Sequence, residues 1–295
     1  MICYYAVGGG LGHLTRAAAV IHTLGIDKPV TLITGSPFAS DPRVIDPGNR
    51  VISVASERLR DRALLRARLA DIFDLVQPSM LIIDAFPAGI LGEIDDSLIP
   101  EKCKCLHLAR LLRWPVYNNR IRAAMPRFDM TYLLEPLYAE HTAGLRQVSR
   151  HMEQLDLEDP PVSFIQSQKY ATKGSCASDA AHSWLIVHAG SDEELIELVS
   201  YARETASLEG SHPAMAAVFP GPRPAALPSD IAHIDIFPAY PMFESAERIF
   251  SACGFNIMRQ TRSLRERHRF MPFARTLDDQ FRRAAIARCD TGQTH

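Results

Sequence analysis

Short runs of apolar, β-branched and aromatic residues alternate with helical patterns along most of this chain. The first run, Ile2–Val7, meets the glycines at 8–10 and is followed by a helical pattern over Leu14–Leu24. A strand, a glycine turn and a helix in this order open a β–α–β unit. Strands that alternate with helices form a parallel sheet that is covered on both faces. The sequence therefore predicts an α/β fold.

The alternation is interrupted once, around residues 154–183, where Asp, Glu, Pro, Ser, Lys and Gly dominate. A length of 295 residues suits roughly two domains of about 100–200 residues each. We therefore predict an N-terminal domain over residues 1–155, a linker over 156–182 and a C-terminal domain over 183–295. Further strands are predicted at Pro29–Thr34, Val51–Val54, Met80–Ile83, Lys104–Leu108, Met130–Leu134, Ser183–His188, Ala214–Phe219, His233–Phe237 and Arg269–Phe273, and helices at Arg58–Val76, Asp192–Leu208, Phe243–Phe250, Gly254–Thr261 and Asp278–Arg288.

Charge and hydropathy narrow the class of partner. Lys and Arg total 32 against 34 Asp and Glu, so the chain has no general field that would attract nucleic acid. The first residues lack the basic segment of a signal peptide, and no apolar run approaches the ~20 residues of a membrane span. Together with six scattered cysteines, these features favour a reduced, cytoplasmic protein. Five arginines between 58 and 68 leave peripheral membrane contact as an alternative to a solvated helix face.

The first glycine turn reads Gly8-Gly9-Gly10-Leu11-Gly12-His13. Glycines let the backbone turn tightly and approach a ligand, and the N–H groups of a helix start attract anions. A dinucleotide-binding turn is disfavoured, because His13 stands at the third glycine position and the second strand ends without an acid. A neutral imidazole can accept a proton from a hydroxyl nucleophile. His13 is therefore a candidate general base, or alternatively a helix cap or packed residue.

Asp84 ends the predicted strand at residues 80–83, so it should emerge at the sheet edge where ligands bind in open α/β folds. There it could orient His13, or it could cap the next helix. Cys103, Cys105 and His107 alternate as on one face of a strand, but a fourth ligand is not in view, so no metal site is expected.

Three motifs in the second half lie at predicted junctions between strands and helices. They are Ala189-Gly190-Ser191, Ser251-Ala252-Cys253-Gly254-Phe255-Asn256 and Asp278-Asp279-Gln280. With Gly12-His13, they give the chain a resemblance to the GT-B glycosyltransferases, particularly the branch that includes the N-acetylglucosaminyltransferase of peptidoglycan synthesis. The segment from Gly254 to Gln260 is similar to that branch's helix-start pattern, and Asp279-Gln280 and Arg283-Ala284 follow a proline-containing strand at matching spacing.

The resemblance implies two Rossmann-like domains that face each other across a cleft. It implies an inverting transfer of a sugar from a nucleotide diphosphate, with UDP expected, to an unknown hydroxyl acceptor, without a cofactor or a metal. His13 would be the general base, and Asp84 would support it. The donor would be bound by Gly9, Gly10, Gly12, Gly190, Ser191, Cys253, Gly254, Phe255, Asn256, Gln260, Asp279 and Gln280.

Two departures from the family pattern leave alternatives open. Cys253 replaces the first glycine of a Gly-Gly pair, and Gln260 replaces a carboxylate that usually holds the ribose hydroxyls. An amide binds two hydroxyls more weakly than a charged group does. A nucleotide-sugar hydrolase or epimerase of the same fold, or a binding protein without catalysis, therefore remains an alternative to the transferase.

Overall fold

The computed structural model describes residues 1–55, 57–121, 123–161 and 184–292. Contacts divide the chain into two compact units. The first consists of Met1–Pro160 with Thr276–Asp279, and the second of Pro161–Arg275 with Gln280–His295. The chain therefore passes from one unit to the other three times. Most of the predicted linker, residues 162–182, lies outside the described residues.

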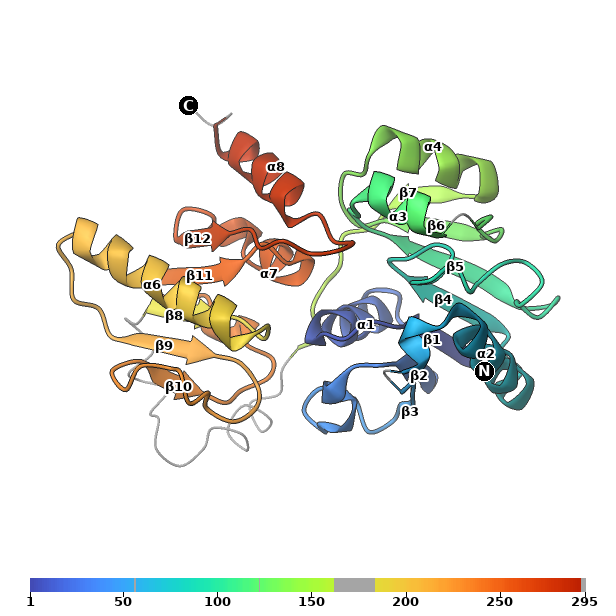
Figure 1. Ribbon diagram of the computed structural model, residues 1–295, viewed down its shortest axis with the longest axis horizontal. Coiled ribbons are helices and arrows are strands. Elements are labelled where there is room, and N and C mark those ends of the chain that lie inside the picture. Colours follow the sequence, from blue (N-terminus) through green and yellow to red (C-terminus); the bar gives the residue numbers. More distant parts are fainter. Residues whose placement is uncertain (56, 122, 162–183, 293–295) are drawn as a thin grey trace. The chain divides into compact units, whose positions relative to one another are not determined.

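The first unit is built on a parallel sheet of seven strands (Figure 1). Their spatial order is β3-β2-β1-β4-β5-β6-β7, so the order reverses between β1 and β4. In open α/β sheets, such a reversal leaves a crevice at the carboxyl ends of the two strands. The strands are β1 (Ile2–Ala6), β2 (Val30–Thr34), β3 (Arg50–Ser53), β4 (Met80–Asp84), β5 (Lys104–Ala109), β6 (Met130–Leu133) and β7 (Met152–Gln154).

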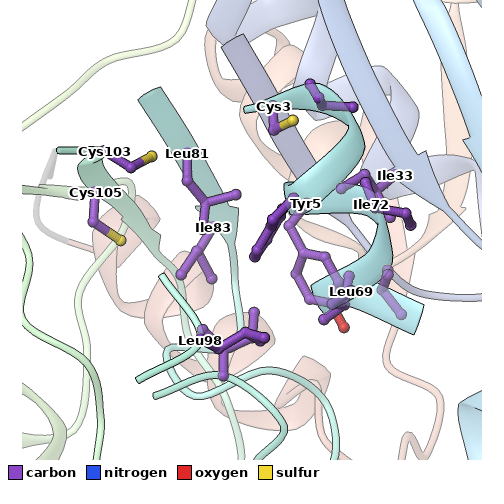
Figure 2. Packing of buried hydrophobic residues seen from close by; sticks show 14 of the residues in the cluster. Cys3, Tyr5, Ile33, Leu69, Ile72, Leu81, Ile83, Leu98, Cys103 and Cys105 are labelled. Carbon is purple, nitrogen blue, oxygen red and sulfur yellow. The ribbon is translucent and has the colours of Figure 1, made fainter. Parts of the chain in front are cut away.

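Helix α2 shows how the sequence builds a covered sheet. The Asp61 carboxylate accepts the backbone N–H groups of Ala63 and Leu64 and so caps the start of the helix. The helix lays its buried side chains, such as Leu69 and Ile72, on β1 and β4 (Figure 2). The helices of this unit are α1 (Leu11–Thr23), α2 (Arg62–Val76), α3 (Trp114–Ile121) and α4 (Ala139–Val148), with short 3-10 turns η1 (Pro37–Ser40) and η2 (Arg58–Arg60).

A buried carboxylate organises the loop that follows β4. Glu93 is fully buried, and its oxygens accept the N–H groups of Ile90 (3.1 Å) and Leu91 (2.7 Å) and the hydroxyl of Tyr5 on β1. Gly89 has a φ of +81°, and a Cβ there would collide with the Glu93 carboxylate. This loop continues directly from Asp84, so the hydrogen bonds of Glu93 hold the backbone that follows this predicted site residue.

Glu93→Gln is expected to lower the free energy of unfolding by about 1–3 kcal/mol at pH 5, because its amide nitrogen would face a backbone N–H group. Burial raises the pKa of Glu93 above the ordinary 4.5. In the native state, Glu93 then keeps its proton at pH values where it loses it in the unfolded chain. The wild-type protein therefore loses stability as the pH rises from 4.5 through the higher pKa of folded Glu93. The difference between the two proteins should therefore narrow towards alkaline pH. Urea unfolding at several pH values measures it.

The exposed Glu101 gives a matched control for this titration, since Glu101→Gln is expected to change the stability by little at any pH. A cost of Glu93→Gln that grows with pH would contradict the role of burial at Glu93.

The second unit repeats the strand order of the first on a smaller scale. Its five parallel strands run β10-β9-β8-β11-β12, with the reversal between β8 and β11 (Figure 1). The strands are β8 (Trp184–Val187), β9 (Met215–Val218), β10 (Ala232–Ile234), β11 (Arg248–Ala252) and β12 (His268–Met271). The helices are α6 (Asp192–Leu208), α7 (Phe255–Gln260) and α8 (Gln280–Gly292), with 3-10 turns η4 (Tyr240–Met242) and η5 (Arg262–Leu264).

The prediction of a helix over Phe243–Phe250 is wrong, because residues 248–252 form the strand β11. This strand lies between β8 and β12, and Ile249, Phe250 and Ser251 are fully buried. A strand that is covered on both faces shows no alternation of polar and apolar residues, so its pattern cannot be told from a short helix. The sequence also did not predict α3, α4 or β7.

Candidate active site

His13 and Asp84 meet at the point where the strand order of the first sheet reverses. His13 lies in the first turn of α1, after the glycine turn that leaves β1, and Asp84 is the last residue of β4. The Nδ1 atom of His13 lies 2.6 Å from Oδ2 of Asp84. Ile83 faces the α2 side of the sheet, so Asp84, its neighbour on the strand, points to the opposite side, where α1 lies.

Arg16 is the third member of this cluster, and the sequence reasoning missed it. Its Nε atom donates to Oδ1 of Asp84 (2.5 Å), and its Nη2 atom donates to Oδ2 (2.6 Å). Asp84 is fully buried, and Arg16 is 2% exposed. Residues three apart on a helix share a face, so the spacing from His13 to Arg16 was the signal that could have identified it.

Electrostatics favours a charged Asp84 beside a neutral His13. Burial alone would raise the pKa of Asp84, but the Arg16 guanidinium and the hydrogen bond from His13 hold it well below its usual range. Burial is also the largest influence on His13 and lowers its pKa below the ordinary 6.5, against the opposing pull of Asp84. A charged carboxylate accepts hydrogen bonds only, so the proton of neutral His13 is on Nδ1 and the lone pair is on Nε2.

Gly8 is the glycine that the His13 geometry requires. A Cβ at Gly8 would collide with the imidazole ring, whereas a Cβ at Gly9 would meet nothing within 4 Å. Gly9, Gly10 and Gly12 are exposed, and Gly10 is the N-cap of α1. The Phe86 ring lies against the imidazole, with 6.0 Å between the ring centroids. The side chain of His13 keeps 12% of its surface exposed, so it is reachable from one side.

A second ion pair lies close to this cluster. Arg110, directly after β5, donates to Oδ1 of Asp278 at 2.6 Å, and its charge also lowers the pKa of His13. Asp278 belongs to the short segment that the first unit takes from the C-terminal part of the chain, and it forms a bridge with Leu112. The four residues Thr276–Asp279 thus contribute a carboxylate to the surroundings of His13.

Gly190 and Ser191 form the turn between β8 and α6, as predicted, but the start of this helix is already acidic. The Ser191 hydroxyl caps the helix by accepting the N–H of Glu194. Glu194 in turn contacts His188 (2.9 Å) and Arg275 (2.5 Å), and a Cβ at Gly190 would collide with the His188 ring. The first turn of α6 contains the carboxylates of Asp192, Glu193 and Glu194, which compete with an external anion for the positive end of the helix. Binding of a diphosphate by Ser191 stays a prediction.

The residues around α7 differ in how they are exposed. Cys253 is fully buried and packs in the core with Met258, so only its backbone faces the turn. Gly254 is the N-cap of α7, and Phe255 is 6% exposed. Asn256 and Gln260 are partly buried, and Gln260 is the last residue of this six-residue helix.

Asp279 and Gln280 are neighbours in sequence but belong to different units. Oδ2 of Asp279 accepts the hydroxyl of Tyr138 at 2.6 Å, within the first unit. Oε1 of Gln280 accepts the N–H groups of Cys253 (3.2 Å) and Phe273 (3.0 Å), and the residue is 4% exposed. Gln280 thus connects two loops of the second unit through hydrogen bonds. The predicted contact of Gln280 with a donor sugar stays a prediction.

Two further expectations concern metals and membranes. Within the described ranges, no group of three or more His, Cys, Asp and Glu side chains is arranged to hold a metal ion. No helix among the described residues has the length and apolar character needed to cross a membrane.

One arginine of the α2 region contacts the loop after β4. Arg66 donates hydrogen bonds to the backbone oxygen of Glu93 and to the carboxylate of Asp95 and so helps to hold this loop in place.

Comparisons with known proteins identify the fold. No protein-family model matches the sequence, and a search of curated proteins found no match. Among solved structures, the spinosyn forosaminyltransferase SpnP is similar with a TM-score of 0.57 and 12% identity over 98% of this chain and 83% of that one. The glycosyltransferase SnogD from Streptomyces nogalater gives 0.56 and 11% over 98% and 88%.

A UDP-GlcNAc 2-epimerase from Methanocaldococcus jannaschii, in complex with UDP-GlcNAc and UDP, gives a TM-score of 0.50 and 12% identity over 100% of this chain and 94% of that one. Identities this low show a shared fold only. The two parallel sheets with their repeated strand order therefore match the two Rossmann-like domains of the GT-B fold, and the predicted α/β class with two such domains is confirmed.

Proposed function

We propose that this protein is an inverting glycosyltransferase that uses a nucleotide-diphosphate sugar, with UDP as the expected nucleotide, and an acceptor hydroxyl. The observation that supports this most directly is the His13–Asp84 contact of 2.6 Å at the strand reversal of the first sheet. It joins a neutral imidazole to a charged carboxylate at the sheet edge where α/β folds bind ligands. The fold, which glycosyltransferases share, supports the same proposal.

In this mechanism, Nε2 of His13 takes the proton of the acceptor hydroxyl as its oxygen attacks the anomeric carbon of the donor sugar. The bond between that carbon and the diphosphate oxygen breaks, and the diphosphate leaves with the electron pair. Asp84 stabilises the imidazolium that forms. Because attack and departure occur on opposite faces, the configuration inverts. The glycines 9, 10 and 12 and the turns at 190–191 and 253–256 would bind the donor, without a metal ion.

A hydrolase is the second candidate. Only 12% of the side-chain surface of His13 is exposed, and a water molecule needs less access to the imidazole than a larger acceptor does. In a hydrolase, the same imidazole would take a proton from water, and free sugar would be the product.

A thermal-shift panel of nucleotide diphosphates and nucleotide sugars tests donor binding, because a ligand that binds the native state raises the melting temperature. We expect UDP and at least one UDP-sugar to raise it. Release of the nucleoside diphosphate is then followed with and without alcohol acceptors. Release that depends on an acceptor supports the transferase, and release with free sugar supports the hydrolase. Absence of any shift across the panel would overturn the proposal.

Gly8→Ala is expected to lower kcat/KM roughly 10- to 100-fold, because the added Cβ displaces the imidazole from its position above Gly8. Gly48→Ala, in an exposed turn of the same unit, is the control and should leave the rate unchanged, since its Cβ would approach only the Asp46 carboxylate. Steady-state kinetics on the donor identified above measures both. Equal rates in the two variants would contradict the position assigned to His13.

A further inference from the structure

The contacts of Arg16 differ from those of a surface salt bridge. The two donor atoms bind one carboxylate oxygen each, at 2.5 and 2.6 Å, which is the two-pronged geometry that only an arginine provides. The side chains of Arg16 and Asp84 are 3% and 0% exposed. Water therefore cannot replace either partner, and the carboxylate is held in one orientation towards Nδ1 of His13.

This arrangement changes what the carboxylate does to the imidazole. A carboxylate alone beside a histidine favours a second proton on the ring, because opposite charges attract. Here the guanidinium already neutralises the carboxylate. Its Nη2 atom also lies 3.1 Å from Nδ1 of His13, so a protonated ring would place one cation against another. Arg16 therefore opposes protonation of His13, while Asp84 still fixes the position of its proton on Nδ1.

The other charges near His13 largely balance each other. Arg110, after β5, is paired with Asp278 of the 276–279 segment at 2.6 Å. The Tyr4 hydroxyl on β1 is buried close to Arg16 and Asp84, and burial raises its pKa well above the ordinary value, so it stays neutral. The charge balance around the imidazole is then decided mainly by Asp84 and Arg16.

We propose that Arg16 is a positioning residue that keeps His13 neutral, with its proton on Nδ1 and its Nε2 lone pair free to accept a proton. The catalytic consequence rests on the proposed function, whereas the state of His13 can be measured without any substrate.

An NMR titration of the histidine side chains tests this, with His13 assigned by comparison with His13→Gln. In the wild-type protein, ¹⁵N shifts should show the tautomer protonated on Nδ1. In Arg16→Gln, the charge of Asp84 acts on the ring without opposition, so the pKa of His13 should rise by about one unit or more, a tenfold change in proton affinity. The double variant Arg16→Gln with Asp84→Asn should return the pKa towards the wild-type value, because the carboxylate charge is gone.

Arg43→Gln is the matched control, since Arg43 forms a similar pair with Asp41 elsewhere in the same unit, and it should not move the His13 titration. If Arg16→Gln does not fold, Arg16→Lys replaces it. Lysine keeps the charge but loses the two-pronged contact, so a smaller rise is expected. An unchanged His13 titration in a folded Arg16 variant would overturn the proposal.

The rate measurement separates this proposal from the proposed function. If the protein turns over a nucleotide sugar, the acid limb of the pH–rate profile should move to higher pH in Arg16→Gln by the same amount as the NMR pKa. A shifted titration with no turnover in any variant would leave the role of Arg16 standing and reject the proposed function.

Discussion

His13→Ala is expected to lower kcat for sugar transfer by about 10²–10⁴-fold, because the acceptor hydroxyl loses the group that takes its proton. The donor should bind with little change, since the imidazole contacts the acceptor side of the reaction. Because burial holds the pKa of His13 below 6.5, the wild-type rate should be flat around neutral pH and should fall as the pH drops below the folded-state pKa. The variant should lack this acid limb.

His22→Ala is the matched control for this experiment. His22 is exposed in the last turn of the same helix, α1, so its removal should leave kcat unchanged. Turnover is measured as release of the nucleoside diphosphate, and donor affinity by calorimetry. A His13→Ala protein with wild-type turnover on every acceptor would show that another group is the base. Loss of donor binding along with turnover would assign His13 to the donor site.

Asp84→Ala is expected to lower the free energy of unfolding by about 3–5 kcal/mol, because it leaves the guanidinium of Arg16 buried without its counter-ion. Arg16 donates a hydrogen bond to each oxygen of Asp84, and the two side chains are 3% and 0% exposed, so water cannot solvate the unpaired guanidinium in the variant. Urea unfolding of the wild-type and variant proteins measures the difference.

Two further variants separate the buried charge from other effects of this substitution. Asp230→Ala breaks an exposed pair with Arg203, in which the Asp230 side chain is 66% exposed and the Arg203 side chain 45%, and should change the stability far less than Asp84→Ala does. Adding Arg16→Met to Asp84→Ala removes the unpaired charge and should restore part of the stability. A cost of Asp84→Ala no larger than that of Asp230→Ala would show that Arg16 finds another partner.

The sequence was most informative where a local pattern has one structural solution. A strand, a glycine turn and a helix can hardly be arranged otherwise, so β1, α1 and the location of His13 followed from the first 24 residues. Asp84 could be placed at the same sheet edge as His13, because the carboxyl ends of parallel strands lie together, although a role in capping the next helix stayed an alternative to contact with His13. Both inferences rest on backbone geometry and need no knowledge of side-chain contacts.

Contacts that depend on packing were harder to predict. Arg16 belongs to a helix with no special composition, and its partner is 68 residues away in sequence. Glu93 carries no local sign of burial, because its partners are backbone groups of its own loop and the hydroxyl of Tyr5 on another strand. No local pattern indicated that the side-chain oxygen of Gln280 accepts hydrogen bonds from two loops of its own unit, and its predicted contact with a donor sugar stays a prediction. Such roles are set by tertiary neighbours.

Because Thr276–Asp279 belongs to the first unit, no single cleavage of the chain would separate the two units. A fragment ending at Pro160 would lack Leu277, which packs beside Trp114, and Asp278, the partner of Arg110. Such a fragment would expose apolar surface and leave the guanidinium of Arg110, which lies close to His13, without its carboxylate partner. The four residues also join β12 and α8, so inserting or deleting residues there would disturb both units at once. Any dissection of this protein should therefore keep residues 276–279 with the N-terminal part.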